Sequence, residues 1–215
     1  MLMAQRLRLV YRRSGETKYL SHLEMMKVWE RGLRRAGWRL AQSQGFNPHP
    51  KISFAAPLPV GVATEADLVE VTLEEGRDPS LAAAEISAQM PAGLAVLSAE
   101  EIPVDSPPVQ RFLRAAEYHA LAVGGDAEAL RREAERIAAA ESLPRQRLRD
   151  GRAQQYDLRP MIQELGVERS PEGNVLLRML LRTDAQGAGR PDEVLREMGL
   201  DPADCAITRT RLILA

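Results

Sequence analysis

The fold is decided near the amino terminus, by the stretch RLRLVYRRSGETKYLSHLEM at residues 6–25. Apolar and basic residues alternate over most of its first seven positions, which is typical of a half-buried strand. Ser21, followed three residues later by Glu24, forms a capping-box pattern. Apolar residues then recur every three to four positions until Gly37, a natural helix stop. The stretch therefore predicts a strand followed by a helix that begins after Ser21.

The next segments complete a β-α-β-β-α-β order within roughly the first hundred residues, the order of the ferredoxin-like arrangement. The right-handed crossover rule then places both helices on one face of an antiparallel sheet. The predicted strands are residues 6–12, 52–55, 68–73 and 94–102, and the predicted helices are 21–36 and 78–90.

A weaker version of the same order follows in the second half of the chain. Strands are predicted at residues 112–123, 145–155, 175–181 and 206–214, helices at 127–141 and 191–199, and an insertion with a helical turn at 157–169. We therefore predict an α+β fold of two tandem ferredoxin-like halves with antiparallel sheets, the second with an insertion. The predicted domains are residues 1–104 and 111–215, joined by a linker at 105–110.

The composition excludes several classes of protein. The 215 residues are 45% hydrophobic, which is enough for a core, but they include one cysteine and three histidines. A disulfide scaffold, a cysteine-rich zinc module and an internally held iron–sulfur cluster are excluded. Neither a signal peptide nor an 18-residue apolar run occurs in the sequence. We therefore expect a cytoplasmic protein that does not enter a membrane and holds no metal.

The charge is unevenly distributed along the chain. The net charge of −1 divides into +8 over residues 1–60, −10 over 61–142 and +1 over 143–215. A basic segment of this kind suits an anion-binding face, because screening limits the useful field to roughly 8–10 Å at physiological salt.

Three basic or polar segments are candidates for contacting nucleic acid or a partner. The first helix carries a basic stripe, the loop after it combines an aromatic, an amide, an imidazole and an ammonium between prolines, and three arginines alternate after residue 144. A solvated surface is the alternative interpretation of the helix stripe and of the alternating arginines. For the loop, the alternative is that Asn47 and Pro48 only turn the chain, Phe46 packs in the core and His49 caps a backbone group. The candidate residues are Lys18, Lys27, Arg31, Arg34, Arg35, Phe46, Asn47, His49, Lys51, Arg145, Arg147 and Arg149.

Four motifs carry a resemblance to a known family: YLSHL at 19–23, SQGFNPHPKISF at 43–54, LPVGV at 58–62 and YDLRP at 156–160. With them the chain resembles the radical SAM-linked protein family, a domain of unknown function found beside or fused to radical SAM proteins. The resemblance implies a radical SAM partner. Because Cys205 is the only thiol, the iron–sulfur cluster and S-adenosylmethionine are expected only in that partner, and no cofactor in this chain.

The expected function is that of a non-catalytic accessory protein that binds structured RNA in RNA modification or processing. One alternative is a protein–protein adaptor that docks on the radical SAM protein without RNA. Another is a metal-independent ribonuclease, in which His22 and His49 act as an acid–base pair. Its tandem halves would be similar to RAMP-type CRISPR endonucleases, but the glycine-rich stretch here, at Gly187 and Gly189, precedes a helix rather than the last strand, and we expect it to be a flexible connection.

Overall fold

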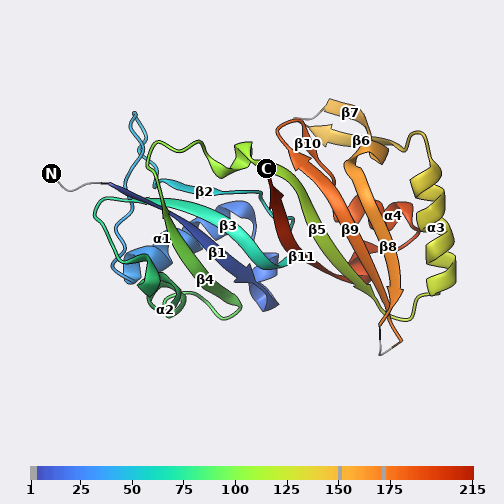
Figure 1. Cartoon of the computed structure of the whole chain (residues 1–215), viewed down its shortest axis with the longest axis horizontal. Coiled ribbons are helices and arrows are strands. Elements are labelled where there is room, and N and C mark those ends of the chain that lie inside the picture. The colour runs from blue at the N-terminus through green and yellow to red at the C-terminus, as the bar shows by residue number, and fades with distance from the viewer. Residues whose placement is uncertain (1–3, 150–151, 171–172) are drawn as a thin grey trace. The chain divides into compact units, whose positions relative to one another are not determined.

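The computed structural model describes residues 4–149, 152–170 and 173–215 and divides into two compact units, Met1–Phe112 and Leu113–Ala215 (Figure 1). The fold is of the mixed α+β class. Among the described residues, eleven strands outnumber four α-helices.

The first unit contains one antiparallel sheet with the strand order β4-β1-β3-β2. Its element order along the chain is β-α-β-β-α-β, with short 3₁₀ turns between. The strands are β1 Gln5–Arg13, β2 Ile52–Phe54, β3 Ala63–Leu73 and β4 Leu94–Ile102, and the helices are α1 His22–Arg35 and α2 Ala82–Ser87.

Both helices of the first unit pack on the same face of its sheet, because they contribute to one core. Trp29 and Leu33 of α1 and Ile86 of α2 are fully buried with apolar residues of all four strands. The rings of Tyr11 on β1 and Trp29 meet edge to face, with 5.2 Å between their centroids. The alternation of β1 is thus explained by a buried apolar face and a polar face.

The predicted capping box at the start of α1 is present. The Ser21 hydroxyl accepts from the Glu24 backbone N–H at 3.3 Å, and the Glu24 carboxylate accepts from the Ser21 backbone N–H at 2.8 Å. At the other end Gly37 adopts a φ of +79°, and the Trp38 N–H donates to the Leu33 carbonyl. The local sequence therefore fixes both ends of α1.

The predicted linker at residues 105–110 packs against the first unit. Val109 is fully buried, and its N–H donates to the Glu70 carboxylate at 3.3 Å. The Gln110 amide donates to the Phe54 carbonyl at 2.6 Å. This segment is therefore an ordered part of the first unit.

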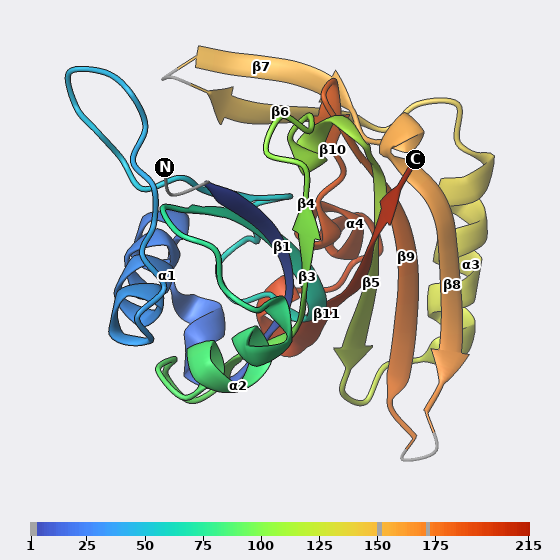
Figure 2. The same cartoon turned by 60° about the vertical axis from the view of Figure 1, so that its left-hand side comes forward.

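The second unit is built around an antiparallel sheet with the strand order β11-β5-β9-β8, to which the short β10 adds beside β9. A separate two-stranded sheet, β6 and β7, leaves the unit as its own ribbon (Figure 2). The strands are β5 Leu113–Ala122, β6 Pro144–Arg149, β7 Arg152–Asp157, β8 Ile162–Arg169, β9 Val175–Asp184, β10 Gly187–Ala188 and β11 Cys205–Leu214, and the helices are α3 Ala127–Ala139 and α4 Pro191–Glu197.

Two predictions for the second half are wrong. Residues 145–155 are not one strand, because β6 ends at Arg149 and a second strand, β7, begins at Arg152 and pairs with it antiparallel. The predicted insertion at 157–169 contains β8, preceded by a short 3₁₀ turn at Arg159–Met161. Because β8 pairs with β9 alone and is largely exposed, it lacks the strict alternation of a half-buried strand.

The glycine-rich stretch of the second unit is ordered. Gly187 lies in β10, and the Gly189 N–H donates to the Arg182 carbonyl at 2.8 Å. A Cβ atom at Gly189 would lie 3.1 Å from the Leu181 side chain. The expected flexible connection is therefore a closely packed turn.

In the part of the chain that the structure describes, none of the helices has the length and apolar character needed to span a membrane.

Candidate binding surface

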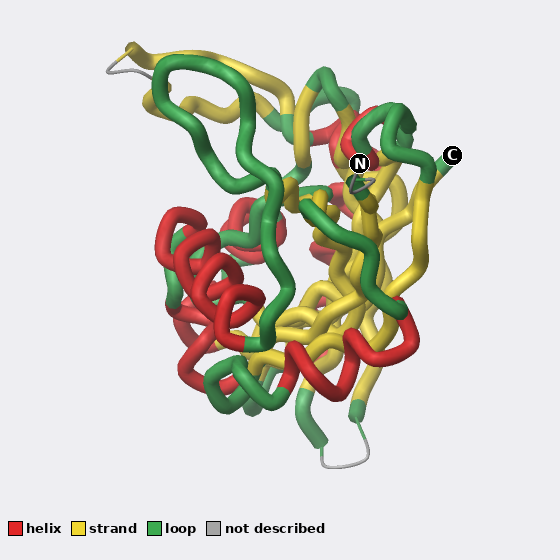
Figure 3. The backbone as a smooth tube through the Cα atoms, turned by 90° about the vertical axis from the view of Figure 1, so that its left-hand side faces the viewer, coloured by secondary structure: helices red, strands yellow, loops and turns green. Residues whose placement is uncertain are grey.

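The loop of residues 41–51, here called the first arm, is a hydrogen-bonded projection of the first unit. The Lys51 N–H donates to the Ala41 carbonyl at 2.9 Å, and the Ser43 N–H donates to the His49 carbonyl at 2.8 Å. The Ser43 hydroxyl accepts from the His49 N–H at 2.9 Å. The Ala41 N–H also donates to Thr72 of β3 at 2.8 Å. Figures 2 and 3 show the arm reaching away from the helices and strands of its unit.

The tip of the first arm presents an aromatic ring to solvent. Phe46 is fully exposed, and Asn47 and Pro48 beside it are exposed as well. Gly45 adopts a φ of +139°, a conformation that other residues rarely take. A fully exposed phenylalanine contributes nothing to the core, so the alternative in which Phe46 packs inside is wrong.

The basic stripe of α1 lies on the solvent side of the helix. Lys27, Arg31, Arg34 and Arg35 are all exposed, as the helical spacing predicts. The Arg35 guanidinium donates to the Gln89 carbonyl. Among the described residues, the other three make no hydrogen bond or ion pair through their side chains. They are therefore the part of the stripe that is available to a ligand.

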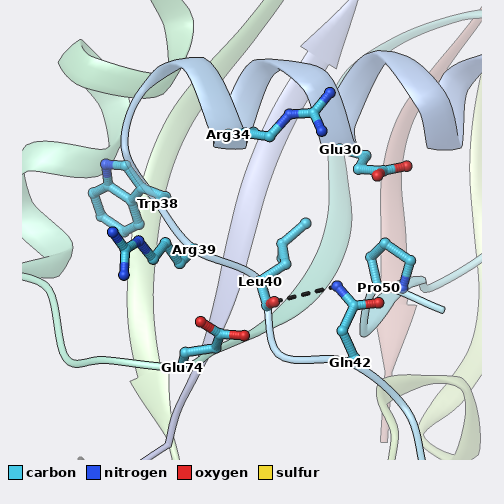
Figure 4. Close-up of a pocket in the computed structure, with 8 residues that line it drawn as sticks. All are labelled: Glu30, Arg34, Trp38, Arg39, Leu40, Gln42, Pro50 and Glu74. Carbon is cyan, nitrogen blue, oxygen red and sulfur yellow. Dashed lines mark hydrogen bonds between the residues drawn. The ribbon is translucent and has the colours of Figure 1, made fainter. Parts of the chain in front are cut away.

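A pocket of about 230 Å³ lies between α1 and the base of the first arm (Figure 4). It joins the basic stripe to the arm, because Arg34 lines it from α1 and Pro50 lines it from the arm. The complete lining is Glu30, Arg34, Trp38, Arg39, Leu40, Gln42, Pro50 and Glu74. Apart from Arg34, none of these residues was predicted as part of a site. Leu40, one of the lining residues, pairs with Leu73 of β3, a contact that local sequence does not reveal.

The positive charge of the amino-terminal segment is largely balanced inside its own unit. Arg6 and Arg8 of β1 form ion pairs with the buried Glu70 of β3, at 2.6 Å and 3.0 Å. Arg8 also pairs with Glu100 of β4 at 3.3 Å. The first unit holds 13 Lys and Arg residues and 13 Asp and Glu residues. The charge imbalance along the sequence is therefore not an imbalance between the two units.

The remaining candidates of the first unit lie in different surroundings. Lys18 is half-buried, and its ammonium lies 5.0 Å from the centroid of the Tyr19 ring. The His22 ring packs edge to face on Phe54, with 5.5 Å between centroids. His49 is exposed on the first arm, and no hydrogen bond or ring contact joins it to His22 among the described residues. The two imidazoles do not form a hydrogen-bonded pair.

The arginines predicted after residue 144 lie in the second unit. Arg145 is on β6, and its guanidinium forms an ion pair with Glu197 of α4. Glu197 also pairs with Arg136 of α3 at 2.6 Å. The side chains of Arg147 and Arg149 lie outside the described residues. Arg145 is thus committed to an internal contact.

The YDLRP motif at residues 156–160 fastens the base of the β6–β7 hairpin. The Asp157 carboxylate accepts from the Leu143 N–H at 2.7 Å and from the Arg159 N–H at 2.9 Å. These backbone donors, Leu143 first, hold the pKa of Asp157 below its ordinary value. Leu158 is fully buried, and the Arg159 guanidinium donates to the Ala138 carbonyl. The contacts of this motif are structural.

A larger pocket, of about 590 Å³, lies over the sheet of the second unit. Most of its charged side chains are already paired: Glu117 with Arg211, and Arg178 with Glu168 at 2.9 Å. A ligand there would have to displace these contacts. A ligand in the pocket beside α1 would displace no ion pair between the described residues that line it.

Among the described residues, no three His, Cys, Asp or Glu side chains are grouped closely enough to hold a metal ion. Cys205 is half-buried at the start of β11. Burial, and then the Asp204 and Asp201 carboxylates, raise the pKa of its thiol. Cys205 is therefore a weak nucleophile at neutral pH.

The chain belongs to the family described as "Uncharacterized protein conserved in bacteria (DUF2344)", which matches residues 6–191. No curated protein matches its sequence. Among solved structures, the fold is similar to a chain in the crystal structure of a Cbf5-Nop10-Gar1 complex, with a TM-score of 0.50 and 12% identity. That match covers 95% of this chain and 48% of the other, so this chain spans about half the length of its structural relative. At this identity the similarity concerns the fold alone.

Proposed function

We propose that this protein is a non-catalytic accessory protein that binds RNA through the first arm and the basic stripe of α1. The observation that carries the proposal is the fully exposed Phe46 at the tip of an arm whose base shares a pocket with Arg34 of α1. An exposed aromatic ring on an arm whose base meets an unpaired cation suits RNA, whose single-stranded bases stack on aromatic rings while Lys and Arg neutralise the phosphates.

The ordered base of the first arm supports this function. Because Ser43 and His49 hold the two sides of the arm together, Phe46 and Asn47 are presented at the end of an ordered segment. Prolines at 48 and 50 restrict the chain further. An arm that is already ordered loses less conformational entropy when it binds.

The fold class proposed for the chain is a tandem of two ferredoxin-like halves. Its basis is the strand order, β4-β1-β3-β2 in the first unit and β11-β5-β9-β8 in the second. In each unit a helix follows the first strand and another precedes the last. In this interpretation the β6–β7 hairpin is the insertion of the second half.

A radical SAM protein is the proposed partner. The motifs at residues 19–23, 43–54, 58–62 and 156–160 carry that resemblance. A single cysteine does not supply the several thiolates that an iron–sulfur cluster requires, so the cluster and S-adenosylmethionine belong to the partner in this proposal.

The test is the salt dependence of RNA binding. Fluorescence anisotropy with a labelled RNA that contains a stem and a single-stranded loop is expected to show affinity that falls steeply between about 50 and 200 mM salt. Charge reversal at Arg31, Arg34 and Lys51 is expected to weaken binding. Arg132→Glu, an exposed arginine of α3 in the second unit, is the matched control. No measurable affinity at 50 mM salt would overturn the proposal.

A specific observation favours a second candidate, the protein–protein adaptor. The equal numbers of acidic and basic residues in the first unit reduce its long-range attraction for a polyanion. Phe46 would then fill an apolar pocket of the radical SAM protein. Co-purification with that protein, unchanged by nuclease and lost in Phe46→Ala, would support the adaptor.

A further inference from the structure

Building on the proposed RNA binding, we propose that the pocket between α1 and the first arm receives one unstacked guanine base. The proposal starts from the four charged side chains around the pocket, Glu30, Arg34, Arg39 and Glu74 (Figure 4). None of them forms an ion pair or a side-chain hydrogen bond with another described residue. Two carboxylates, which accept hydrogen bonds, and two guanidiniums, which donate them, therefore surround one cavity without pairing with each other.

This absence of pairing contrasts with the polar face of the sheet in the first unit. On the sheet, Arg6 and Arg8 reach Glu70. Around the pocket, Glu30 and Arg34 have the spacing of a helical ion pair but make none. A ligand that carries hydrogen-bond donors on one edge and acceptors on another would satisfy both signs of charge.

The size and the apolar surface of the pocket suit a single base. Its volume of about 230 Å³ is below that of a pocket for a drug-sized molecule. Leu40 and Pro50 are half-buried and give it apolar surface. Trp38 is fully buried; its indole N–H donates to Glu85 at 2.7 Å, and the Arg77 guanidinium lies 5.5 Å from its ring centroid. These contacts make the Trp38 side of the pocket rigid.

Guanine is the base that matches this set of side chains. Its N1–H and N2 amine donate side by side, which suits one carboxylate, and its O6 and N7 accept side by side, which suits one guanidinium. Adenine offers a single donor group on its Watson–Crick edge, and uracil offers a single N–H. Glu30 and Glu74 provide the carboxylates, and Arg34 and Arg39 provide the guanidiniums.

The first arm carries two further groups that are available to an RNA strand bound in this pocket. Lys51 is exposed next to Pro50 and is available to the attached phosphate. Phe46 at the tip is available to stack on a neighbouring base. Unpaired nucleotides, rather than a duplex, are therefore the expected target, because only there are the base edges accessible.

The experiment compares single-stranded uridine oligonucleotides that carry one central guanine, adenine or inosine. We expect guanine to bind about tenfold more tightly than adenine, with inosine between them, because inosine lacks the N2 amine. The double variant Glu30→Gln, Glu74→Gln is expected to reduce this preference to less than twofold while all-uridine RNA still binds. Glu65→Gln, an exposed carboxylate on β3, is the matched control, and thermal unfolding verifies that each variant is folded.

The outcomes separate this inference from the proposed function. Equal affinity for the three central bases, with salt-dependent binding intact, would overturn the guanine pocket and leave RNA binding standing. A guanine preference that survives the double variant would also overturn it. No RNA binding at low salt would overturn the proposed function and this inference together.

Discussion

The first arm and the β6–β7 hairpin are two projections built from antiparallel segments, but different kinds of contact hold them in place. The base of the first arm is held by backbone hydrogen bonds and the Ser43 hydroxyl, and its tip exposes Phe46. The hairpin is held by two carboxylates, Asp157 at its base and Glu197, which pairs with Arg145.

The difference shows which basic residues are available to bind a ligand and which are used in contacts within the fold. An arginine contributes to a binding surface only where no carboxylate of the fold reaches it. Glu197, on a helix about fifty residues later in the sequence, pairs with Arg145, so the sequence around Arg145 does not reveal this ion pair. Arg34 follows Glu30 by four residues on α1, and both Arg31 and Arg34 remain unpaired among the described residues. The first arm therefore belongs to a surface for binding, and the β6–β7 hairpin uses its charges for stability.

The largest expected effect comes from removing the tip of the first arm. Phe46→Ala is expected to weaken RNA binding by about tenfold or more, because stacking of a base on an aromatic ring contributes about 1–3 kcal/mol. The melting temperature should not change, since Phe46 is fully exposed. Arg145→Ala is the contrasting variant: anisotropy should show unchanged RNA affinity, and thermal unfolding should show a lower melting temperature. An equal loss of binding in both variants would contradict the comparison.

The next effect concerns the stability of the second unit. Glu197→Ala removes the partner of both Arg136 and Arg145, and is expected to lower the free energy of unfolding by about 1–2 kcal/mol. Urea denaturation followed by circular dichroism measures this change. Glu141→Ala, an exposed carboxylate after α3, should be nearly neutral. If the two variants are equally stable, the hairpin is not fastened through Glu197.

Much of this architecture follows from local sequence signals. The capping box at Ser21 and the stop at Gly37 are encoded within one turn of the ends of α1, so that helix was predicted with nearly its observed limits. Asp126 likewise caps α3, accepting from the Glu128 and Ala129 N–H groups. These elements are predictable because the residues that cause them are neighbours in sequence.

The remaining features depend on contacts between distant segments. The strand β8 was missed because an exposed edge strand has no strict alternation, and the pairing of Arg145 was missed because its partner lies on α4. The α1 stripe and the exposed arm were predicted as candidates from helical spacing and composition. The pocket that joins them was not, since Glu74 reaches it only through the pairing of adjacent chain segments.

Acid should loosen the hairpin and spare the first arm. Because the folded-state pKa of Asp157 is depressed, its contribution to stability is complete above the ordinary aspartate pKa and is lost as the pH falls through the lowered value. Once Asp157 is protonated, it holds the Leu143 and Arg159 N–H groups less strongly. As the pH falls, their hydrogen exchange should therefore become faster than the intrinsic pH dependence of amide exchange alone predicts. The Ser43 and His49 contacts contain no titrating acceptor, so those amides should follow the intrinsic dependence.

The Asp157→Asn variant supplies the control for this measurement. It should show weaker protection of Leu143 at neutral pH and no additional loss in acid, because its side chain no longer titrates. Acid-induced loss that persists in the variant would show that another group fastens the hairpin.

The smallest expected effect is in the fastening of the first arm itself. Ser43→Ala removes one acceptor, the hydroxyl that receives the His49 N–H, and leaves the Ser43 N–H to His49 carbonyl contact in place. A hydrogen bond of this kind contributes about 0.5–1.5 kcal/mol, so RNA affinity should fall by roughly two- to tenfold through increased motion of the tip. Hydrogen exchange at His49 should accelerate while the melting temperature stays constant. Unchanged exchange at His49 would mean that the backbone contacts alone hold Phe46 in position, and that the two projections differ less in their fastening than their side chains indicate.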